Sequence, residues 1–236
     1  MDNKKVVCIV QARIGSTRLP GKMLQLLGEH TLLEWVLLRV KRANLIDVLV
    51  LATTDNERDN EIVNVAKALG INVFCGSEQN VLSRFVEVSE LYSSDIVIRV
   101  CADNPFIAPE EIDRLIMYFT QSDCDYACNH RPVLDNQYAD GFGAEIFSKK
   151  ILMEIVGHAK SPAHFEHVTA YLWEHQDSYK LCSFKAPAEL AYPELKFDID
   201  TEEDLNFLNL LVKVHSIGID TPAADIVKFC SNLKDK

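Results

Sequence analysis

Short apolar runs alternate with amphipathic stretches along the first half of the chain. The apolar runs are rich in β-branched residues and occupy residues 5–12, 47–54, 71–76 and 95–100. The stretches between them repeat apolar residues at helical spacing, at 31–43, 60–70, 80–92 and 109–121. Strands that alternate with helices form βαβ units, in which parallel strands are covered on both faces. The pattern therefore predicts an α/β fold with a doubly wound, mostly parallel sheet.

Boundary signals support these predicted helices. Thr31 and Glu34 have the spacing of a capping box, in which each side chain accepts a hydrogen bond from the other residue's backbone. Gly70 follows the second helical stretch, where a glycine ends a helix readily. Pro109 stands in the first turn of the fourth, a position that needs no backbone N–H donor.

The second half of the chain is less regular. Its apolar pattern predicts strands within 125–130, 141–148, 179–186 and 195–200, and helices over 161–175, 201–215 and 221–233. We interpret the whole of 1–236 as one domain, with residues 130–195 forming a smaller inserted lobe that shapes a pocket over the sheet.

Composition excludes several classes of protein. The chain has 24 Lys and Arg against 35 Asp and Glu, a net charge of −11, which argues against a broad nucleic-acid-binding face. Its apolar runs fall short of the roughly 18–20 residues that span a bilayer, and the start "MDNKKVVCIV" does not suit a signal peptide. Seven cysteines without a CxxC pair predict reduced thiols and a cytoplasmic location; Cys124 and Cys128 lack the second pair typical of a zinc site.

One loop stands out against this acidic background. The sequence "QARIGSTRLPGK", residues 11–22, follows the first predicted strand and carries Arg13, Arg18 and Lys22 beside two glycines. In open α/β sheets ligands bind at the carboxyl ends of strands, and backbone amides with cationic side chains can cradle phosphates there. Neither the Walker pattern nor GxGxxG is present. Charge alone leaves a solvated basic loop as an equal alternative.

Aspartates at two other strand ends point to a metal ion. Asp103 follows the fourth predicted strand, and Asp198 and Asp200 lie two positions apart in a predicted strand, therefore on one face. Mg²⁺ is commonly held by one or two carboxylates together with substrate phosphates. The alternative for Asp200 is a helix cap, which Thr201 can also supply.

At this point the chain resembles a known family. The segments "IVQARIGSTRLPGK", "LATT", "FCGSEQNVLSRF", "RVCADNPFI", "DGFGAEIFS", "HFEHVTAYLWEH" and "FDIDTEEDL" are similar, in order and spacing, to those of CTP-dependent nucleotidyltransferases. These are the spore-coat-polysaccharide cytidylyltransferases and the enzymes that make CMP-activated acidic sugars. The resemblance implies a Rossmann-like fold of the nucleotide-diphospho-sugar transferase type, Mg²⁺ as cofactor and a homodimer built through the inserted lobe.

The resemblance also implies roles for individual residues. Catalysis is expected of Lys22, Arg13 and Asp103, and metal binding of Asp103, Asp200 and Asp198. Nucleotide binding is expected of Gln11, Ala12, Arg13, Gly15, Ser16, Arg18, Lys22, Thr53, Arg84 and Asp103. The sugar side would be lined by Asp140, Glu145, His164, Glu166 and His167.

The chain departs from the family beside Asp103, where the aspartate and the proline are kept, and at two places on the sugar side. The family commonly has Pro-Asp-Gly followed by Leu-Asp, where this chain has Ala139-Asp140-Gly141 followed by Phe142-Gly143. It often has an arginine where this chain has Phe165, and Gly-Asp-Cys-Pro in place of residues 102–105. Fewer charged groups are therefore expected around the sugar.

The resemblance implies transfer of CMP from CTP to an acidic sugar, with release of pyrophosphate. His164 and His167, three positions apart in one predicted helix, could instead bind zinc, but no third ligand at suitable spacing is evident. Two rival functions stay open. A nucleotide-sugar-dependent glycosyltransferase would normally show a DxD motif where this chain has "ADNP". A non-catalytic nucleotide-binding protein would not need all three cations and both aspartate sites.

Overall fold

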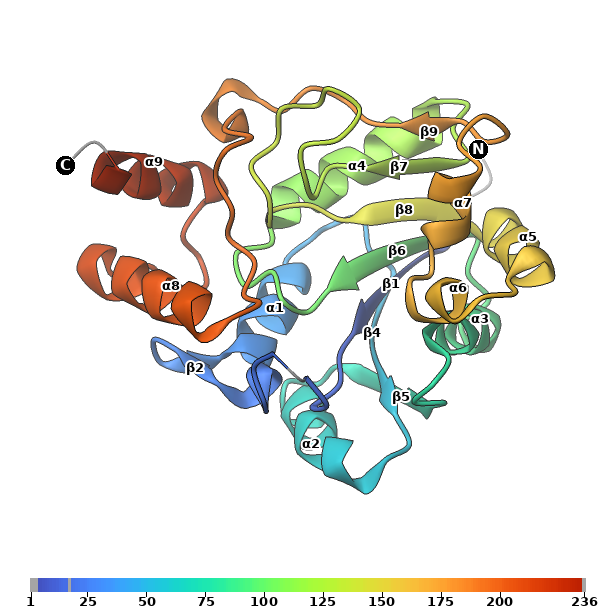
Figure 1. Cartoon of the computed structure of the whole chain (residues 1–236), viewed down its shortest axis with the longest axis horizontal. Coiled ribbons are helices and arrows are strands. Elements are labelled where there is room, and N and C mark those ends of the chain that lie inside the picture. The colour runs from blue at the N-terminus through green and yellow to red at the C-terminus, as the bar shows by residue number, and fades with distance from the viewer. Residues whose placement is uncertain (1–3, 17, 235–236) are drawn as a thin grey trace.

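The computed structural model describes residues 4–16 and 18–234, whose main feature is a large mixed sheet (Figure 1). The sheet has the strand order β5-β4-β1-β6-β8-β7-β9. These strands are β1 (Val6–Gln11), β4 (Val48–Thr54), β5 (Asn72–Gly76), β6 (Ile96–Cys101), β7 (Tyr126–Cys128), β8 (Glu145–Ser148) and β9 (Leu181–Cys182). β1, β4, β5 and β6 pair in parallel, whereas β8 runs antiparallel to β6 and β7. The predicted α/β fold with a mostly parallel sheet is confirmed.

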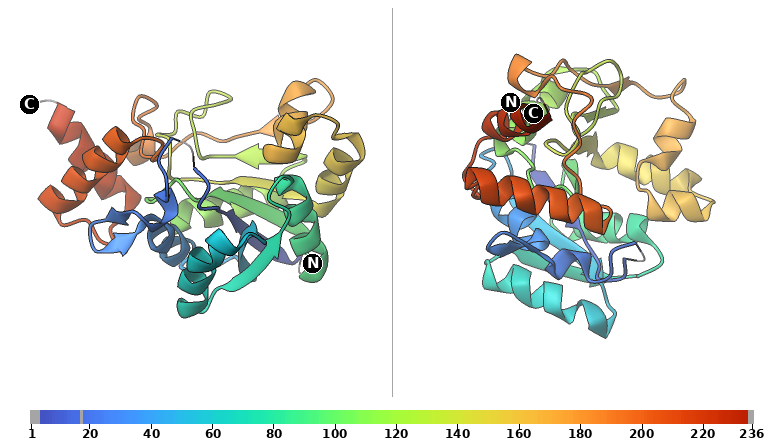
Figure 2. Two further views of the ribbon diagram at one scale, coloured as in Figure 1. Left: turned by 60° about the horizontal axis from the view of Figure 1, so that its bottom comes forward. Right: turned by 60° about the vertical axis from the view of Figure 1, so that its left-hand side comes forward.

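Helices pack against both faces of this sheet (Figures 1 and 2). They are α1 (Leu32–Val40), α2 (Asn60–Ala68), α3 (Val81–Leu91), α4 (Pro109–Gln121), α5 (Lys149–His158), α6 (Pro162–Glu166), α7 (Ala170–Glu174), α8 (Glu202–His215) and α9 (Ala223–Lys234). Short 3-10 turns η1 (Lys22–Leu24), η2 (Glu57–Asp59) and η3 (Ala188–Leu190) and a hairpin of β2 (Leu26–Leu27) and β3 (His30–Thr31) complete the described part. None of the described helices is both long and apolar enough to traverse a membrane.

The alternation of side chains along β1 divides the core into two parts. Val6, Cys8 and Val10 belong to a buried cluster that includes residues of α1, α4 and α8. Val7 and Ile9 belong to a second cluster, with residues of α3 and α5. Because successive strand residues point to opposite faces, each face of the sheet has a core of its own. The end of β1, from which the basic loop departs, is therefore held from both sides.

The predicted boundary signals operate as expected in the first half. Thr31 and Glu34 form the capping box of α1 through both of its hydrogen bonds. Pro109 is the first residue of α4. Gly70 lies just beyond α2 with φ of 68°, a left-handed conformation that suits glycine.

Two elements of the second half differ from the prediction. Residues 161–175 form two short helices, α6 and α7, rather than one. Val168, between them, is fully buried, and the Thr169 hydroxyl donates a hydrogen bond to Glu145 at 2.7 Å. These tertiary contacts replace the continuous helix that the local pattern favours. Residues 195–200 form no strand either: Lys196 makes only an isolated bridge to Asp140.

Residues 130–195 share the main sheet. They supply β8 and β9 as well as α5, α6 and α7, which lie at the opposite end of the molecule from α8 and α9 (Figure 1). Whether this segment acts as a separate lobe, and whether it forms the predicted homodimer, stay predictions. What the structure adds is that the segment reaches the carboxyl ends of β1 and β6 through the turn between α6 and α7.

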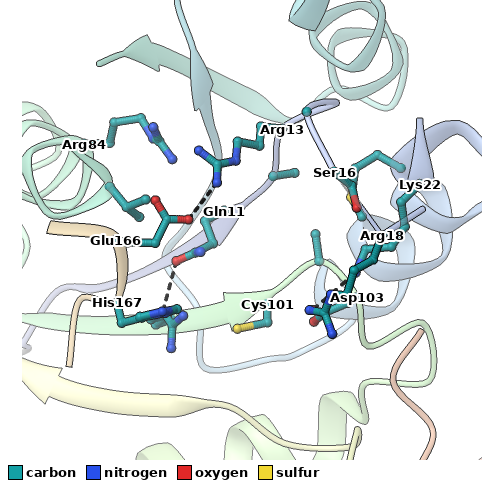
Figure 3. Close-up of a pocket in the computed structure, with 16 residues that line it drawn as sticks. Gln11, Arg13, Ser16, Arg18, Lys22, Arg84, Cys101, Asp103, Glu166 and His167 are labelled. Atoms are coloured by element: carbon teal, nitrogen blue, oxygen red, sulfur yellow. Dashed lines mark hydrogen bonds and ion pairs between the residues drawn. The ribbon is translucent and has the colours of Figure 1, made fainter. Parts of the chain in front are cut away.

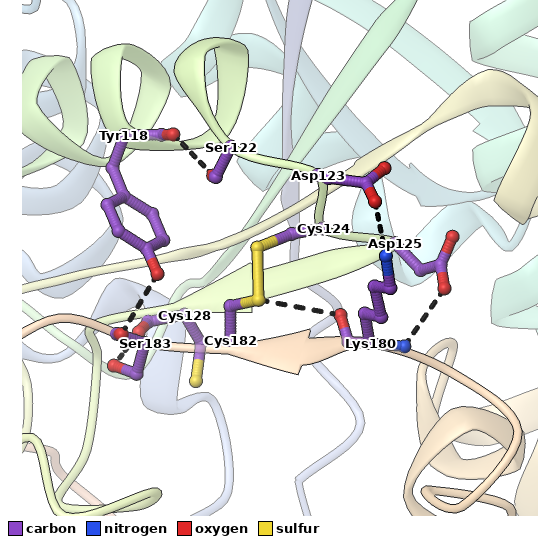
Figure 4. The surroundings of a disulfide bond; sticks show 9 residues. All are labelled: Tyr118, Ser122, Asp123, Cys124, Asp125, Cys128, Lys180, Cys182 and Ser183. Carbon is purple, nitrogen blue, oxygen red and sulfur yellow. Dashed lines mark hydrogen bonds and ion pairs between the residues drawn. A yellow bond between two sulfur atoms is a disulfide. The ribbon is translucent and has the colours of Figure 1, made fainter.

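A disulfide bond joins Cys124, just before β7, to Cys182 in β9 (Figure 4). The prediction that all seven thiols are reduced is therefore wrong for this pair, and Cys124 is not available as a metal ligand beside Cys128. Spacing could not reveal the bond, because 58 residues separate its two cysteines. Nearby, Lys180 pairs with Asp123, so the start of β9 is tied to the end of α4 by two links.

Candidate active site

A polar cavity of about 390 Å³ lies at the carboxyl ends of β1 and β6 (Figure 3). Its lining includes nine of the ten residues predicted to bind the nucleotide, namely Gln11, Ala12, Arg13, Gly15, Ser16, Arg18, Lys22, Arg84 and Asp103. It also includes Met23, Val81, Arg99, Cys101, Ala102, Glu166 and His167. The basic loop is thus one wall of a cavity rather than a solvated surface segment.

The loop after β1 is anchored by a buried aspartate. Asp59 accepts hydrogen bonds from the Ile14 backbone N–H at 2.8 Å and from the hydroxyls of Thr53 and Thr54. Gly15 lies so close to Arg58 that a Cβ atom would come within 2.9 Å of its guanidinium. That guanidinium is the far end of a side chain that is 44% exposed and can move aside, so the contact does not by itself require a glycine. Asp59 fixes the direction in which the loop leaves the sheet.

Thr53 contributes to this support and not to the cavity. Its side chain is fully buried, and its hydroxyl donates to Asp59 at 3.3 Å. The sequence analysis places Thr53 near the base or ribose. In the structure Thr53 lies behind the cavity wall and is not among the residues that line the cavity. Its effect on a ligand would be transmitted through Asp59 and the backbone of Ile14.

The exposed cations of the loop are paired with carboxylates. Arg13 contacts Glu166 at 2.8 Å, and Arg18 contacts Asp200 at 2.8 Å. The side chains of Arg13 and Glu166 are 35% and 38% exposed, and that of Arg18 is 67% exposed. Ion pairs this open to water contribute little to stability, so an anionic ligand can replace the carboxylate partners.

Lys22 is the most buried of the three loop cations. Its ammonium donates to the Ile199 carbonyl at 2.7 Å and lies 3.5 Å from both Asp103 and Asp200. The Ile199 backbone N–H in turn donates to the Asp103 carbonyl at 2.9 Å. Lys22 therefore joins two aspartates that are almost a hundred residues apart in the chain, at one corner of the cavity.

Asp200 is not the cap of α8. That cap is Thr201, which forms a capping box with Asp204, while the Asp200 carboxylate faces Arg18 and Lys22. The alternative role considered for Asp200 is thus filled by its neighbour. Its carboxylate remains free to serve a ligand in the cavity.

Further carboxylates crowd this corner. Burial, and then the charge of Asp198, raises the pKa of Asp140 to about 6. The pKa of Asp198 is raised as well. Burial is the main cause, the ion pair with Lys196 offsets it in part, and the charge of Asp103 adds to it. Asp198 Oδ1 is buried and has no hydrogen-bond partner among the described residues. A cation bound nearby would lower the pKa of both carboxylates, because it stabilises their charged forms.

The donor set fits Mg²⁺ only in part. Among the described residues, no group of three or more His, Cys, Asp or Glu side chains is placed to hold a metal ion. Asp103 and Asp200 do converge on Lys22, and two carboxylates with substrate phosphate and water satisfy an ion that prefers six oxygen ligands. The residues therefore fit a magnesium ion that arrives with its nucleotide.

A second cavity of about 500 Å³ adjoins the first. Arg99, Cys101 and His167 line both cavities. The remaining lining residues of the second are His130, Arg131, Glu145, Thr169, Ala170, Trp173 and Glu174. Two ligands that occupied the two cavities would thus meet above Arg99 and Cys101.

A buried ion pair forms the floor between the cavities. Arg99 pairs with Glu145 and also donates to the Gln11 side chain at 3.0 Å. The two charged side chains are only 10% and 5% exposed. Burial raises the pKa of Glu145 and is the largest single influence, but the nearby positive charges, Arg99 first among them, and the hydrogen bond from Thr169 together lower it below its ordinary value. This pair is built into the protein, because neither partner can turn to solvent.

The second cavity also has cationic and aromatic walls. The Arg131 guanidinium lies 5.5 Å from the centre of the Trp173 ring. Burial lowers the pKa of His130 to about 4, so its imidazole is neutral at physiological pH. Arg131 therefore provides a positive charge in this cavity that does not depend on pH.

Three of the five predicted sugar-side residues line a cavity, and the other two do not. Glu145, Glu166 and His167 line one or both cavities. His164 lines neither cavity but meets Glu174, which lines the second, at 2.7 Å. Asp140 also lines neither cavity and lies near Asp198. Because His167 ends α6 in an extended conformation, the two histidines do not share a helix face, which is the arrangement that the zinc alternative requires.

The residues that the sequence analysis missed belong to the second cavity. Arg99 is a cation inside an otherwise apolar strand, and that exception was a usable signal. Cys101 is the last residue of the same strand, at the edge where ligands bind. His130, Arg131 and Trp173 come from separate segments, and no local pattern relates them.

Comparisons with known proteins agree on the family. A family model described as cytidylyltransferase matches residues 7–218. The spore coat polysaccharide biosynthesis protein SpsF of Bacillus subtilis is 34% identical over 98% of this chain and 95% of its own. A 3-deoxy-manno-octulosonate cytidylyltransferase of Leptospira interrogans is 29% identical over 93% of each chain.

A solved structure agrees as well. The structure of a cytidylyltransferase from Leptospira borgpetersenii superposes with a TM-score of 0.89 at 27% identity, covering 98% of this chain and 96% of that one. Since the family model spans most of the sequence and a relative above 30% identity matches nearly end to end, the chain belongs to the cytidylyltransferase family of CTP-using nucleotidyltransferases.

Proposed function

We propose that this protein transfers CMP from CTP to an acidic sugar and releases pyrophosphate, in the biosynthesis of a surface polysaccharide. One observation carries the proposal: a cavity lined by phosphate-binding cations adjoins a second cavity that holds a fixed cation, and the two share Arg99, Cys101 and His167. The printed names of the relatives, a spore coat polysaccharide protein and an octulosonate cytidylyltransferase, support the choice of product and acceptor class.

On the nucleotide side, the loop cations take the triphosphate. Arg13 and Arg18 exchange Glu166 and Asp200 for phosphate oxygens, because both pairs are open to solvent. Lys22 stays in place through its bond to the Ile199 carbonyl and presents a fixed positive charge to the leaving pyrophosphate. Phosphoryl-group chemistry needs mainly such positioning and charge stabilisation from a protein.

Asp103 and Asp200 would hold Mg²⁺. When bound, the ion neutralises charge on the phosphate oxygens and stabilises the leaving group. Lys22, 3.5 Å from both carboxylates, keeps them on the same side of the cavity before the nucleotide arrives. Asp198 would be a further ligand beside this corner, because its buried Oδ1 has no hydrogen-bond partner among the described residues while its Oδ2 pairs with Lys196 at 3.0 Å.

On the acceptor side, Arg131 pairs with the acidic group of the sugar. Glu145 accepts a hydrogen bond from Thr169 and is neutralised by Arg99, so its carboxylate can receive sugar hydroxyls without repelling an anion. His167 lines both cavities, where the attacking oxygen meets the α-phosphate, and its imidazole can take up the proton that this oxygen loses.

The experiment is a pyrophosphate-release assay with Mg²⁺. Each of the four nucleoside triphosphates is tested against a panel of acidic sugars, neutral sugars and sugar phosphates. We expect release with CTP and an acidic sugar, and none with the matched neutral sugar. A glycosyltransferase or an inert binding protein releases no pyrophosphate from CTP with any acceptor, so that result in a protein that still binds CTP would overturn the proposal.

A further inference from the structure

The loop between β7 and Asp140 has a strained backbone. Leu134, Asp135 and Gln137 have φ angles of 51°, 56° and 65°, in the left-handed region that residues other than glycine disfavour. Glycines aside, only two residues elsewhere in the described part of the chain adopt a positive φ. Strain of this kind persists where surrounding contacts hold the backbone, and it is concentrated at functional sites. The contacts that hold this loop therefore outweigh its strain.

Asn136 lies within the strained loop and supplies these contacts. Its side chain is buried, with the residue only 1% exposed. Its amide Nδ2 donates to the Arg131 carbonyl at 3.0 Å and to the Ser183 hydroxyl at 2.8 Å. Its Oδ1 accepts from the Tyr138 backbone N–H at 3.0 Å. Because Oδ1 has to face this N–H donor, the orientation of the amide is fixed, and both hydrogens of Nδ2 are used inside the protein.

On one side, Asn136 is anchored to the edge of the main sheet. The Ser183 hydroxyl, which accepts from Asn136, donates in turn to the Cys128 carbonyl of β7 (Figure 4). Ser183 directly follows Cys182, whose disulfide bond with Cys124 fastens β9. The partner of Asn136 on this side is therefore held by both sheet pairing and a covalent link.

On its other side, Asn136 holds the backbone of Arg131. The Arg131 guanidinium lines the second cavity and lies 5.5 Å from the centre of the Trp173 ring. It forms no ion pair with a carboxylate of the described residues. A long side chain without such a partner takes its place from its backbone and from the ring beside it. The position of this cation in the cavity therefore depends on the bond between Asn136 and the Arg131 carbonyl.

We propose that Asn136 is a positioning residue for the sugar acceptor. It ties the backbone of Arg131 to the sheet edge and so keeps the guanidinium beside Trp173, where it meets the acidic group of the sugar. The identity of that group rests on the proposed function. The hydrogen-bond partners of the Asn136 side chain do not line the first cavity, so acceptor affinity depends on Asn136 and CTP affinity does not.

The test uses the pyrophosphate-release assay with Mg²⁺, CTP and the acidic sugar that gives release. Asn136→Asp keeps the shape of the side chain and the bond from Tyr138, but it loses both donated bonds. We expect it to raise the KM for the sugar about tenfold or more and to leave the Kd for CTP within about twofold. Asn209→Asp is the matched control, because the Asn209 amide likewise accepts one backbone N–H and donates to another segment, in α8.

A double variant separates positioning from general damage to the fold. Arg131→Met should raise the same KM, and adding Asn136→Asp to it should have no further effect, because the charge that Asn136 positions is then absent. Ser183→Ala removes one of the two groups that accept from Asn136, and as a milder variant it should raise the KM about threefold. The proposal is wrong if Asn136→Asp leaves the KM unchanged, or raises it equally with and without Arg131.

Tryptophan emission gives a readout that does not depend on the reaction. The chain has two tryptophans, Trp35 and Trp173, and the Arg131 charge lies over the ring of Trp173. Loss of this charge in Arg131→Met should shift the emission maximum, and Asn136→Asp should shift it in the same direction. A native chain that releases no pyrophosphate with any acceptor would remove the proposed function, and the emission would still decide this inference. Emission that Arg131→Met shifts and Asn136→Asp leaves in place would overturn it.

Discussion

The two sides of the active site hold their charges differently. In the first cavity, Arg13 pairs with Glu166 and Arg18 with Asp200, and each pair keeps at least one side chain more than a third exposed to water. On the acceptor side, Arg99 and Glu145 are closed off from solvent and bonded to each other. The first kind of pair can be exchanged for a ligand, and the second cannot. The comparison teaches that one site can contain exchangeable cations and structural cations of the same chemical type.

The largest effect should come from breaking the closed pair. Arg99→Met leaves Glu145 charged and buried beside a neutral side chain, at a cost of about 3–5 kcal/mol in the free energy of unfolding. Arg13→Met, at the open pair, should cost less than about 1 kcal/mol. Urea unfolding of both variants measures the difference. Equal costs would show that the two pairs do not differ in the way described.

Catalysis should fail when the fixed charge on the nucleotide side is removed. Lys22→Ala and Asp103→Asn should each lower turnover about a hundredfold or more, which is about 3 kcal/mol in the activation barrier. Lys150→Ala is the matched control, because Lys150 is 82% exposed on α5. Folding is checked by circular dichroism. Unchanged turnover in both folded variants would remove these residues from the mechanism.

The crowded carboxylates should make stability depend on pH. The pKa of Asp140 is about 6 in the folded protein and 3.8 in its ordinary state, so the folded state binds more protons between these values and loses stability as pH rises through them. Asp140→Asn should reduce this slope, leaving the part due to Asp198, and stabilise the protein above the window by about 1–2 kcal/mol, allowing for solvent screening. Urea unfolding on both sides of the window measures it; a variant less stable above it would contradict the account.

The smallest effect should come from freeing an open cation. Glu166→Gln leaves Arg13 without its carboxylate partner, so the dissociation constant for CTP should fall by about two- to fivefold, in keeping with an exposed ion pair. Isothermal titration with CTP measures the change, and added salt should reduce it. A weaker affinity for CTP would mean that Glu166 supports the nucleotide instead of competing with it.

Sequence analysis predicted most of the lining of the first cavity because that lining is largely local. The strand, the loop with Gly15 and the cations lie within one short segment, and the capping box of Thr31 and Glu34 depends only on near neighbours. The acceptor side depends on distant contacts. The burial of Val168 and the bond from Thr169 to Glu145 break a helix that the local pattern favours.

Contacts beyond the local sequence also explain why residues 195–200 do not form the predicted strand. Asp200 is held by Arg18 and Lys22, which come from the loop after β1, and Asp198 pairs with Lys196 of its own segment; neither is held by strand pairing. Arg99 is the exception, since a cation within an apolar strand could have been noticed. Its pairing with Glu145 still required the register between β6 and β8, in which the two residues face each other.

The most direct measurement follows the phosphates of CTP during the reaction. CTP labelled at the α-phosphate and CTP labelled at the γ-phosphate are supplied separately with Mg²⁺ and the acidic sugar that releases pyrophosphate. The account predicts that the α-label enters a CMP–sugar product and the γ-label enters pyrophosphate. Transfer of the γ-label to the sugar, or an α-label that remains in CDP, would contradict attack at the α-phosphorus and the account with it.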